Sequence, residues 1–179
     1  TGVRAEYSML ADDFQGAIEV TVAGFFTTQH SFRTSTGYWG KLTFPAFSDQ
    51  ATFCREDGVD LVMRKMHWMG TAHELLIGKI KCASADRAGL LKRDILIDYD
   101  GRRYRFEPEG ALKGGWYLTD EVGTRLLDIR PCGMFRQGAI LNITGTMEGN
   151  LVIFVYYMFH VRGQEEAAAV AATTAASAN

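Results

Sequence analysis

The sequence has little cysteine and little proline, and it holds no apolar run of the length of about 20 residues that crosses a bilayer. Its three cysteines, Cys54, Cys82 and Cys132, stand singly among 179 residues. A metal-binding pair would need a closer spacing, and a disulfide framework would need an even count. We therefore expect reduced, buried cysteines in a cytoplasmic protein. The opening residues, TGVRAEYSML, contain no apolar run of the kind that a signal peptide has.

The chain also lacks a strong charge of either sign. Its formal net charge is −2, and Glu165 and Glu166 account for that value. Nucleic-acid binding needs a concentrated positive surface, so we do not expect it. Hydrophobic residues make up 47% of the sequence and charged residues 22%. This composition and length suit a soluble globular protein of one domain with a sizeable core.

Helical periodicity is missing before residue 149, and short alternating segments take its place. Alternation of apolar and polar residues is typical of strands that are buried on one face. It occurs in AIEVTVAG (17–24), DLVMRKM (60–66), DILIDY (94–99), RRYRFEP (102–108), TRLLDIRP (124–131) and AILNITG (139–145). Turn signals such as Asp57-Gly58 and Asp100-Gly101 separate them, because Asp-Gly suits the positive φ angles of a type I′ hairpin turn. The pattern predicts an antiparallel meander.

An internal repeat indicates how many strands there are. AGLLKRDILIDYDG (88–101) matches CGMFRQGAILNITG (132–145) at an offset of 44 residues, and FPAFSDQATFCREDG (44–58) is an earlier copy. Each unit predicts about four short strands, a number that also suits a propeller blade. At most three units fit in this chain, and a propeller needs at least about four blades. A closed barrel removes exposed strand edges with fewer strands, so we expect a barrel of about twelve strands.

The segment LVIFVYYMFHVR (151–162) is apolar on every side apart from His160. It is too short for a bilayer, which needs about 20 apolar residues, and it does not alternate as the strands do. A helix that is apolar all round must be buried all round, and a wide barrel needs a filling. We therefore predict a closed antiparallel barrel over 16–164 around a central hydrophobic helix near 151–162. An N-terminal arm (1–15) and an Ala-rich tail (165–179) that frays after a turn or two would flank it.

Such a barrel closed around a C-terminal hydrophobic helix resembles the tubby C-terminal fold. The segment DGRRYRFEPEGALKGGWYLTDEVGTRLLDIRPCGMFRQGAILNI (100–143) resembles the LURP-one-related and phospholipid-scramblase-like branch of that superfamily, and GKLTFPAFSDQATFCREDG (40–58) shows the same order of strand, turn and loop. The resemblance covers roughly residues 40–162. It implies a non-enzymatic role, in phosphoinositide or membrane-surface binding and adaptor work. Lipid binding of the tubby type uses basic residues from neighbouring strands.

The candidate binding residues are therefore basic. Five are selected for lipid or phosphate binding: Arg64, Lys65, Arg102, Arg103 and Arg105. The two-residue period of a strand puts Arg103 and Arg105 on one face, and Arg102 on the side of Tyr104. Arginine forks suit phosphate groups. The alternative interpretation is a solvated outer face on which nearby aspartates balance these charges: Asp94, Asp98 and Asp100.

We predict no catalytic residue, no cofactor and no metal site. His67, His73 and Glu74 do not have the spacing of a zinc-binding helix, and His73 and Glu74 would face opposite ways on a strand. His160 is expected to be a hydrogen-bonded residue of the core or of the helix end. The tryptophans, Trp39, Trp68 and Trp116, lie beside glycines in predicted loops. They either cap the ends of the barrel or form an exposed surface for a partner.

These features favour a non-catalytic binding or scaffold module that docks at an anionic, phosphoinositide-containing membrane surface. We expect a cytoplasmic protein, peripheral at the membrane and not transmembrane, whose partner is anionic lipid or another protein. One alternative is a small-molecule-binding barrel of lipocalin type, which would keep an open lumen. Another is a protein-interaction subunit of a larger assembly. An enzyme would need a cleft with perturbed titratable groups, and the sequence indicates none.

Overall fold

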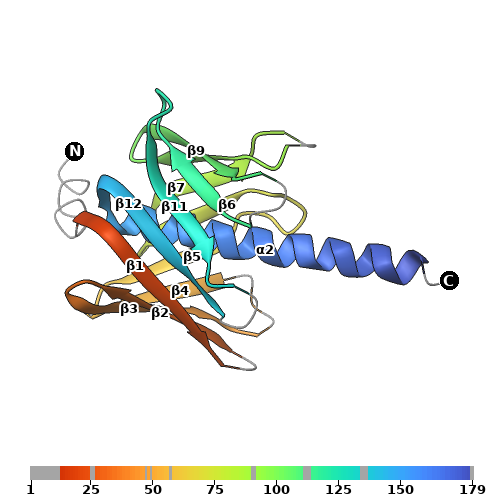
Figure 1. Ribbon diagram of the computed structural model, residues 1–179, viewed down its shortest axis with the longest axis horizontal. Coiled ribbons are helices and arrows are strands. Elements are labelled where there is room, and N and C mark those ends of the chain that lie inside the picture. The colour runs from red at the N-terminus through yellow and green to blue at the C-terminus, as the bar shows by residue number, and fades with distance from the viewer. Residues whose placement is uncertain are drawn as a thin grey trace.

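The computed structural model describes residues 13–24, 27–46, 48, 50–56, 58–89, 92–110, 114–133 and 137–177. In this part of the chain the elements are β1 (Asp13–Ala23), β2 (Thr28–Thr34), β3 (Gly37–Phe44), β4 (Gln50–Arg55), β5 (Asp60–Lys65), β6 (His73–Ile77), β7 (Ile80–Arg87), β8 (Ile95–Tyr99), β9 (Arg102–Pro108), β10 (Trp116–Thr119), β11 (Arg125–Pro131), β12 (Gly138–Glu148) and α2 (Gly149–Ser177). Figure 1 shows the strands wrapped around α2, which runs on beyond the barrel toward the C-terminus.

The strands form one closed antiparallel barrel. Each strand pairs with the next along the chain, and β12 pairs with β1 to close the ring. Alternation fixes which side faces inward: on β8, Ile95 and Ile97 are fully buried while Leu96 and Asp98 face outward. The prediction of a twelve-stranded barrel around a C-terminal helix is confirmed.

All six segments that alternate in the sequence are strands, and the repeat also has a structural basis. Its three copies contain β4, β8 and β12, so each copy ends a group of four strands. The predicted hairpin turn at Asp100-Gly101 is present, with φ angles of 47° and 77°. Strand β6 is not among the predicted strands. Four of its five residues are buried, so its sequence HELLI does not alternate between apolar and polar residues.

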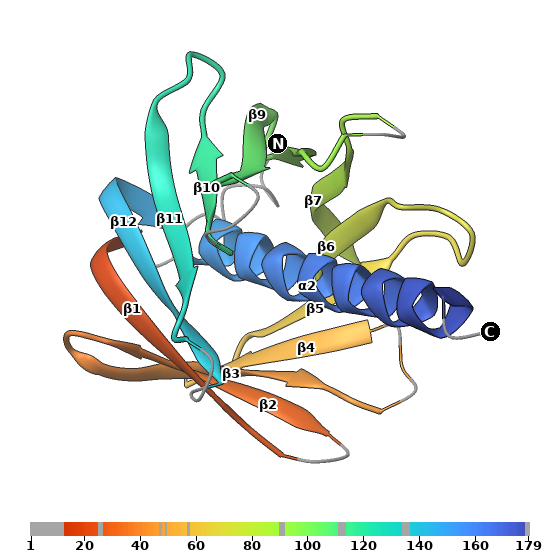
Figure 2. The ribbon, with the colours of Figure 1, turned by 45° about the vertical axis from the view of Figure 1, so that its right-hand side comes forward.

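The apolar segment is a helix inside the barrel, as predicted. Residues 151–158 are each at most 3% exposed, because strands surround them on every side (Figure 2). Burial of this kind outweighs the modest helix propensity of Val152, Ile153 and Val155. Among the described residues, no helix is long and apolar enough to cross a membrane.

Both ends of the domain differ from the sequence prediction. Strand β1 begins at Asp13, three residues before the predicted barrel boundary, and residues 1–12 of the predicted arm lie outside the described residues. The predicted fraying of the tail after a turn or two is wrong, because α2 continues to Ser177. A helix already nucleated inside the barrel adds one hydrogen bond per residue, and alanine has the highest helix propensity.

The two ends of the barrel have different connections. The acidic end, where α2 begins, holds the β4–β5, β8–β9 and β10–β11 connections, which carry Glu56, Asp100, Asp120 and Glu121. The exit end, where α2 leaves the barrel, holds the β1–β2, β3–β4, β5–β6 and β7–β8 connections. This division follows from the antiparallel order, since every even-numbered strand runs toward the acidic end.

Candidate functional site

The five predicted basic residues do not form one cluster. Arg64 and Lys65 end β5 near the exit end, whereas Arg102, Arg103 and Arg105 lie on β9. The pairing register puts Arg64, Glu74, Ser84, Asp98 and Arg103 in one outward row across five strands. Strands lie about 4.8 Å apart, so Arg64 and Arg103 are about 19 Å from each other along that row.

Carboxylates beside these residues neutralise most of them. Arg64 Nε donates to Glu74 Oε1 over 2.8 Å. Arg103 lies 3.4 Å from Asp98, and Arg105 lies 3.5 Å from Asp94, both across strand pairs. Asp94 and Asp98 therefore balance Arg105 and Arg103, as the alternative interpretation expected, whereas Arg102 has no such partner among the described residues. Exposed pairs of this kind contribute about 0.2–1 kcal/mol each to stability and leave little net charge for a ligand.

The β5–β6 loop, residues 66–72, exposes two large apolar side chains next to each other. Trp68 is 82% exposed and Met69 78%, whereas Trp39 and Trp116 are buried in β3 and β10. Hydrogen bonds within the loop hold it closed, from Met66 N to Ala72 O over 2.9 Å and from Gly70 N to His67 O over 3.1 Å. The exposed-surface interpretation of the tryptophans thus holds for Trp68 alone.

Lys65 is fixed beside this loop. Its Nζ donates to the backbone carbonyl of Trp68 over 3.4 Å, which places the ammonium group against the backbone of the loop. Lys65 also lines a small cavity of about 180 Å³ at the exit end, together with Ser48, Gln50 and Gln164. A basic residue close to an exposed tryptophan and methionine is typical of segments that lie at a membrane interface.

Two adjacent tyrosines of α2 attach the helix to two separate strands of the barrel wall, β2 and β6. The Tyr156 hydroxyl and His30 Nδ1 of β2 are hydrogen-bonded over 2.7 Å, and the Tyr157 hydroxyl and His73 Nδ1 of β6 over 2.8 Å. Burial raises the pKa of Tyr156, so the phenol stays neutral. The sequence does contain an indication of these contacts. Two tyrosines in an apolar helix carry hydroxyl groups, and buried hydroxyl groups need hydrogen-bond partners.

A third histidine completes this layer. The rings of His160 and His30 lie 4.6 Å apart between centroids, and Phe44 packs against both. Burial, with the charge of His160, lowers the pKa of His30 to about 3, and burial lowers the pKa of His160 to about 4. Both imidazoles are therefore neutral at physiological pH. The described residues contain no group of three His, Cys, Asp or Glu side chains that could hold a metal ion.

Ion pairs hold α2 where it leaves the barrel. Arg87 Nη2 donates to Glu165 over 3.0 Å, Arg93 donates to Glu166 over 2.8 Å, and Arg162 also donates to Glu165. Although burial favours the neutral acid, the hydrogen bonds from the two arginines lower the pKa of Glu165. The two glutamates that set the net charge of the chain are therefore occupied by basic residues of the barrel rim and of α2.

The prediction that the cysteines are buried is wrong. All three cysteines are free, but Cys54 is exposed and Cys82 and Cys132 are only partly buried. Cys54 points outward because it alternates with the inward-facing Phe53 on β4. Burial and the neighbouring Asp60 raise the pKa of its thiol, so it is not an activated nucleophile.

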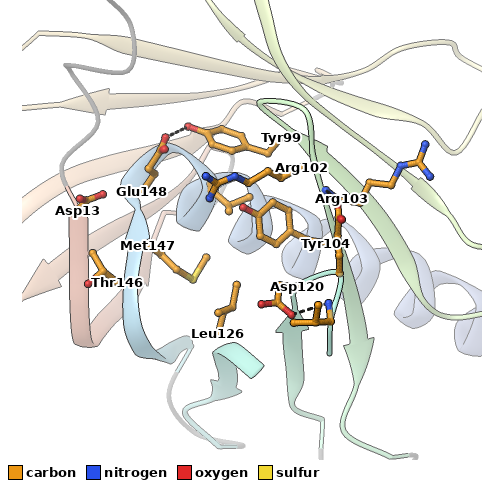
Figure 3. A pocket seen from close by; sticks show the side chains of 13 residues that line it. Asp13, Tyr99, Arg102, Arg103, Tyr104, Asp120, Leu126, Thr146, Met147 and Glu148 are labelled. Atoms are coloured by element: carbon orange, nitrogen blue, oxygen red, sulfur yellow. Dashed lines mark hydrogen bonds between the residues drawn. The ribbon is translucent and has the colours of Figure 1, made fainter. Parts of the chain in front are cut away.

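A cavity with a volume of about 600 Å³ lies at the acidic end of the barrel (Figure 3). Arg102 and Tyr104 line it, whereas the Arg103 side chain extends away from it. The Tyr99 hydroxyl donates to Glu148 Oε2 over 2.5 Å at its edge. Burial and the bond to Glu148 raise the pKa of Tyr99.

No protein-family model matches the sequence, and neither a curated protein nor a solved structure is similar to it.

Proposed function

We propose that the protein is a non-catalytic binding module that docks on anionic membrane surfaces through its β5–β6 loop. The observation that carries the proposal is the exposure of Trp68 and Met69, at 82% and 78%, in a chain whose other two tryptophans are buried. Tryptophan favours the membrane–water interface because its ring is apolar and its N–H is polar. Methionine adds a flexible apolar side chain that can enter the acyl boundary.

Charge near the loop supports an anionic surface. Lys65 is held against the loop, and Lys92 is exposed in the β7–β8 connection at the same end. A basic residue near an anionic membrane contributes about 1 kcal/mol. The opposite end carries Glu56, Asp100, Asp120 and Glu121 in its connections, which an anionic surface would repel.

The predicted resemblance to the tubby and scramblase-like superfamily agrees with a membrane-surface role. It remains a prediction, as does a location at the cytoplasmic face.

The projecting part of α2 limits how the barrel can dock. The helix extends well past the exit end in Figure 1, so it would strike a surface that approached along the barrel axis. The β5–β6 loop must therefore reach the membrane with the barrel tilted. The filled interior removes the open lumen that a lipocalin-type carrier needs, since residues 151–158 occupy it.

Vesicle flotation of the full chain tests the proposal. Wild type should float with vesicles that contain phosphatidylserine or phosphoinositide and not with neutral ones, and binding should weaken with salt. Trp68→Ala combined with Met69→Ala should reduce binding at least tenfold. Val122→Ser is the matched control, because Val122 is 87% exposed at the acidic end. Equal binding of the loop variant and the control would contradict the proposal, as would no binding to any vesicle.

A further inference from the structure

We propose that the cavity at the acidic end binds a small organic cation, an ammonium group attached to an apolar body. This goes beyond the proposed membrane docking, since the cavity lies at the opposite end of the barrel from Trp68. Its volume of about 600 Å³ is within the range of small-molecule sites, roughly 300–1,000 Å³.

Unpaired carboxylates dominate the charge of the cavity. Asp13, Asp120, Glu121 and Glu148 line it. None of the four lies within 4.0 Å of a basic group among the described residues, whereas the aspartates of β8 and of the loop before it have arginine partners. Three of the four carboxylates accept hydrogen bonds from uncharged groups. Glu148 accepts from the Tyr99 hydroxyl, Glu121 from the backbone N–H of Arg103, and Asp120 from the backbone N–H groups of Val122 and Thr124. Four carboxylates against the two guanidinium groups of the lining leave a negative site, which favours a cationic ligand.

The carboxylates are spread around the cavity, and this spacing selects the size of the cation. No three acidic, histidine or cysteine side chains of the described chain are close enough to share a metal ion. A divalent metal would need several oxygen ligands at about 2.0–2.6 Å. A larger organic cation can meet separate carboxylates from the middle of the space.

Aromatic and apolar side chains complete the site. Tyr99 and Tyr104 line it, and ring faces attract ammonium and quaternary ammonium groups within about 6 Å. Leu126, Met147 and Leu151 provide the apolar part of the lining. These groups would bury the body of the ligand, which a bare acidic patch could not do.

One buried acceptor without a partner in the described part of the chain lies behind the lining of the cavity, next to Tyr99. Asn150 is 4% exposed and lies beside the Tyr99 hydroxyl. Its Oδ1 has no hydrogen-bond partner among the described residues. Unpaired buried acceptors are rare in folded proteins, and a hydroxyl or N–H donor of a ligand that reached past Tyr99 would satisfy this one.

Substitutions at Arg102 and at Glu148 should change the affinity for a cation in opposite directions. The Arg102 side chain lies on the Tyr99 and Glu148 side of the cavity in Figure 3, and no ion pair holds it among the described residues. Because it repels a cation, Arg102→Gln should strengthen binding of a cationic ligand. Glu148→Gln should weaken it while keeping an acceptor for Tyr99.

The experiment is a calorimetric titration of the full chain with choline and with its neutral isostere 3,3-dimethylbutan-1-ol. Choline should bind at least tenfold more tightly than the alcohol. Glu148→Gln and Asp13→Asn should each weaken choline binding at least fivefold, and Arg102→Gln should strengthen it at least threefold. The Trp68→Ala and Met69→Ala protein should bind choline as wild type does, which separates this site from membrane docking.

Several results would overturn the proposal. Equal affinities for choline and for the alcohol would show that the charge of the ligand does not contribute to binding. Choline binding that survives Glu148→Gln and Asp13→Asn, in proteins whose circular dichroism is native, would place the site elsewhere. Calcium binding that displaces choline would assign the carboxylates to a metal ion instead.

Discussion

The hydroxyl of Tyr156, on the helix inside the barrel, lies 2.7 Å from Nδ1 of His30 on β2. The next residue, Tyr157, makes the corresponding contact with His73 on β6 over 2.8 Å. Two neighbouring residues of α2 thus contact two separate strands of the barrel wall, β2 and β6, which fixes the rotation and the depth of the helix. These are specific polar contacts in a layer that is otherwise apolar, and they can be removed one atom at a time.

Tyr156→Phe and Tyr157→Phe should each lower the free energy of unfolding by about 1–3 kcal/mol, because each leaves a buried imidazole nitrogen without its partner. Urea unfolding at pH 7 measures the effect. Tyr38→Phe is the control, since Tyr38 is 46% exposed on β3 and should change stability little. Equal stability of all three variants would mean that the two contacts do not hold the helix.

Stability should fall as the solution is acidified below pH 6.5. The pKa of His30 is about 3 in the folded protein, well below the usual 6.5, so the unfolded chain binds a proton that the folded one does not. His30 therefore contributes stability that is present above pH 6.5 and lost as the pH falls toward 3. The free energy of unfolding falls by about 1.4 kcal/mol per pH unit while the unfolded chain holds one proton more than the folded chain. Titration of His160 lowers the free energy of unfolding further, by a smaller amount.

Urea unfolding at pH 7, 6 and 5 measures this dependence. His30→Gln should flatten the curve between pH 6 and 5, although it lowers stability at pH 7. A stability that stays constant or rises on acidification, with no difference between wild type and His30→Gln, would show that the pair titrates normally.

Removing parts of α2 should give two different results. A chain that ends after Glu166 keeps the buried turns and the ion pairs of Glu165 and Glu166, so it should fold with a native β spectrum. A chain that ends after Glu148 loses the filling of the barrel and should aggregate. Circular dichroism and size-exclusion chromatography distinguish the two, and a folded monomer ending at Glu148 would refute the role of the helix as core.

Two glycines should respond to alanine with opposite signs. A Cβ on Gly40 would lie 2.4 Å from a ring carbon of Phe53 and 2.8 Å from the carbonyl oxygen of Cys54. Gly40→Ala should therefore destabilise the protein by about 1–3 kcal/mol through overpacking. Gly163 lies in α2 with nothing within 4 Å of its would-be Cβ, so Gly163→Ala should stabilise by about 0.5–1 kcal/mol. Thermal unfolding of both variants checks the signs, and a shift of the same sign in both would contradict the packing described.

The fold could be predicted from the sequence because its main signals are local. Alternation on β8 and β12, the Asp100-Gly101 turn and the unbroken apolar run of α2 each indicate one element without knowledge of the others. The repeat then supplies the number of strands. Strand β6 is buried on both faces and alternates nowhere, so only its pairing with β5 and β7 identifies it.

The site was harder to predict because it depends on pairing across strands. Arg64 and Arg103 share one row of the sheet, but three strands separate them. Only the pairing register shows this separation and identifies Glu74 and Asp98 as their partners. Trp39, Trp68 and Trp116 all stand near glycines in the sequence, and only the strand boundaries separate the exposed one from the two buried ones. The acidic cavity joins residues from β1, β8, β9, β12 and the β10–β11 connection, which no local pattern links.

Tryptophan fluorescence with vesicles of brominated anionic lipid is the most direct test of the membrane-docking proposal. Trp68 is the exposed tryptophan, at 82%, while Trp39 and Trp116 are 7% and 5% exposed inside the barrel wall. We predict that emission of the full chain shifts to the blue and is quenched by bromine, and that Trp68→Phe abolishes both changes. Vesicle binding without quenching would contradict docking through the β5–β6 loop, and quenching that persists in Trp68→Phe would contradict it equally.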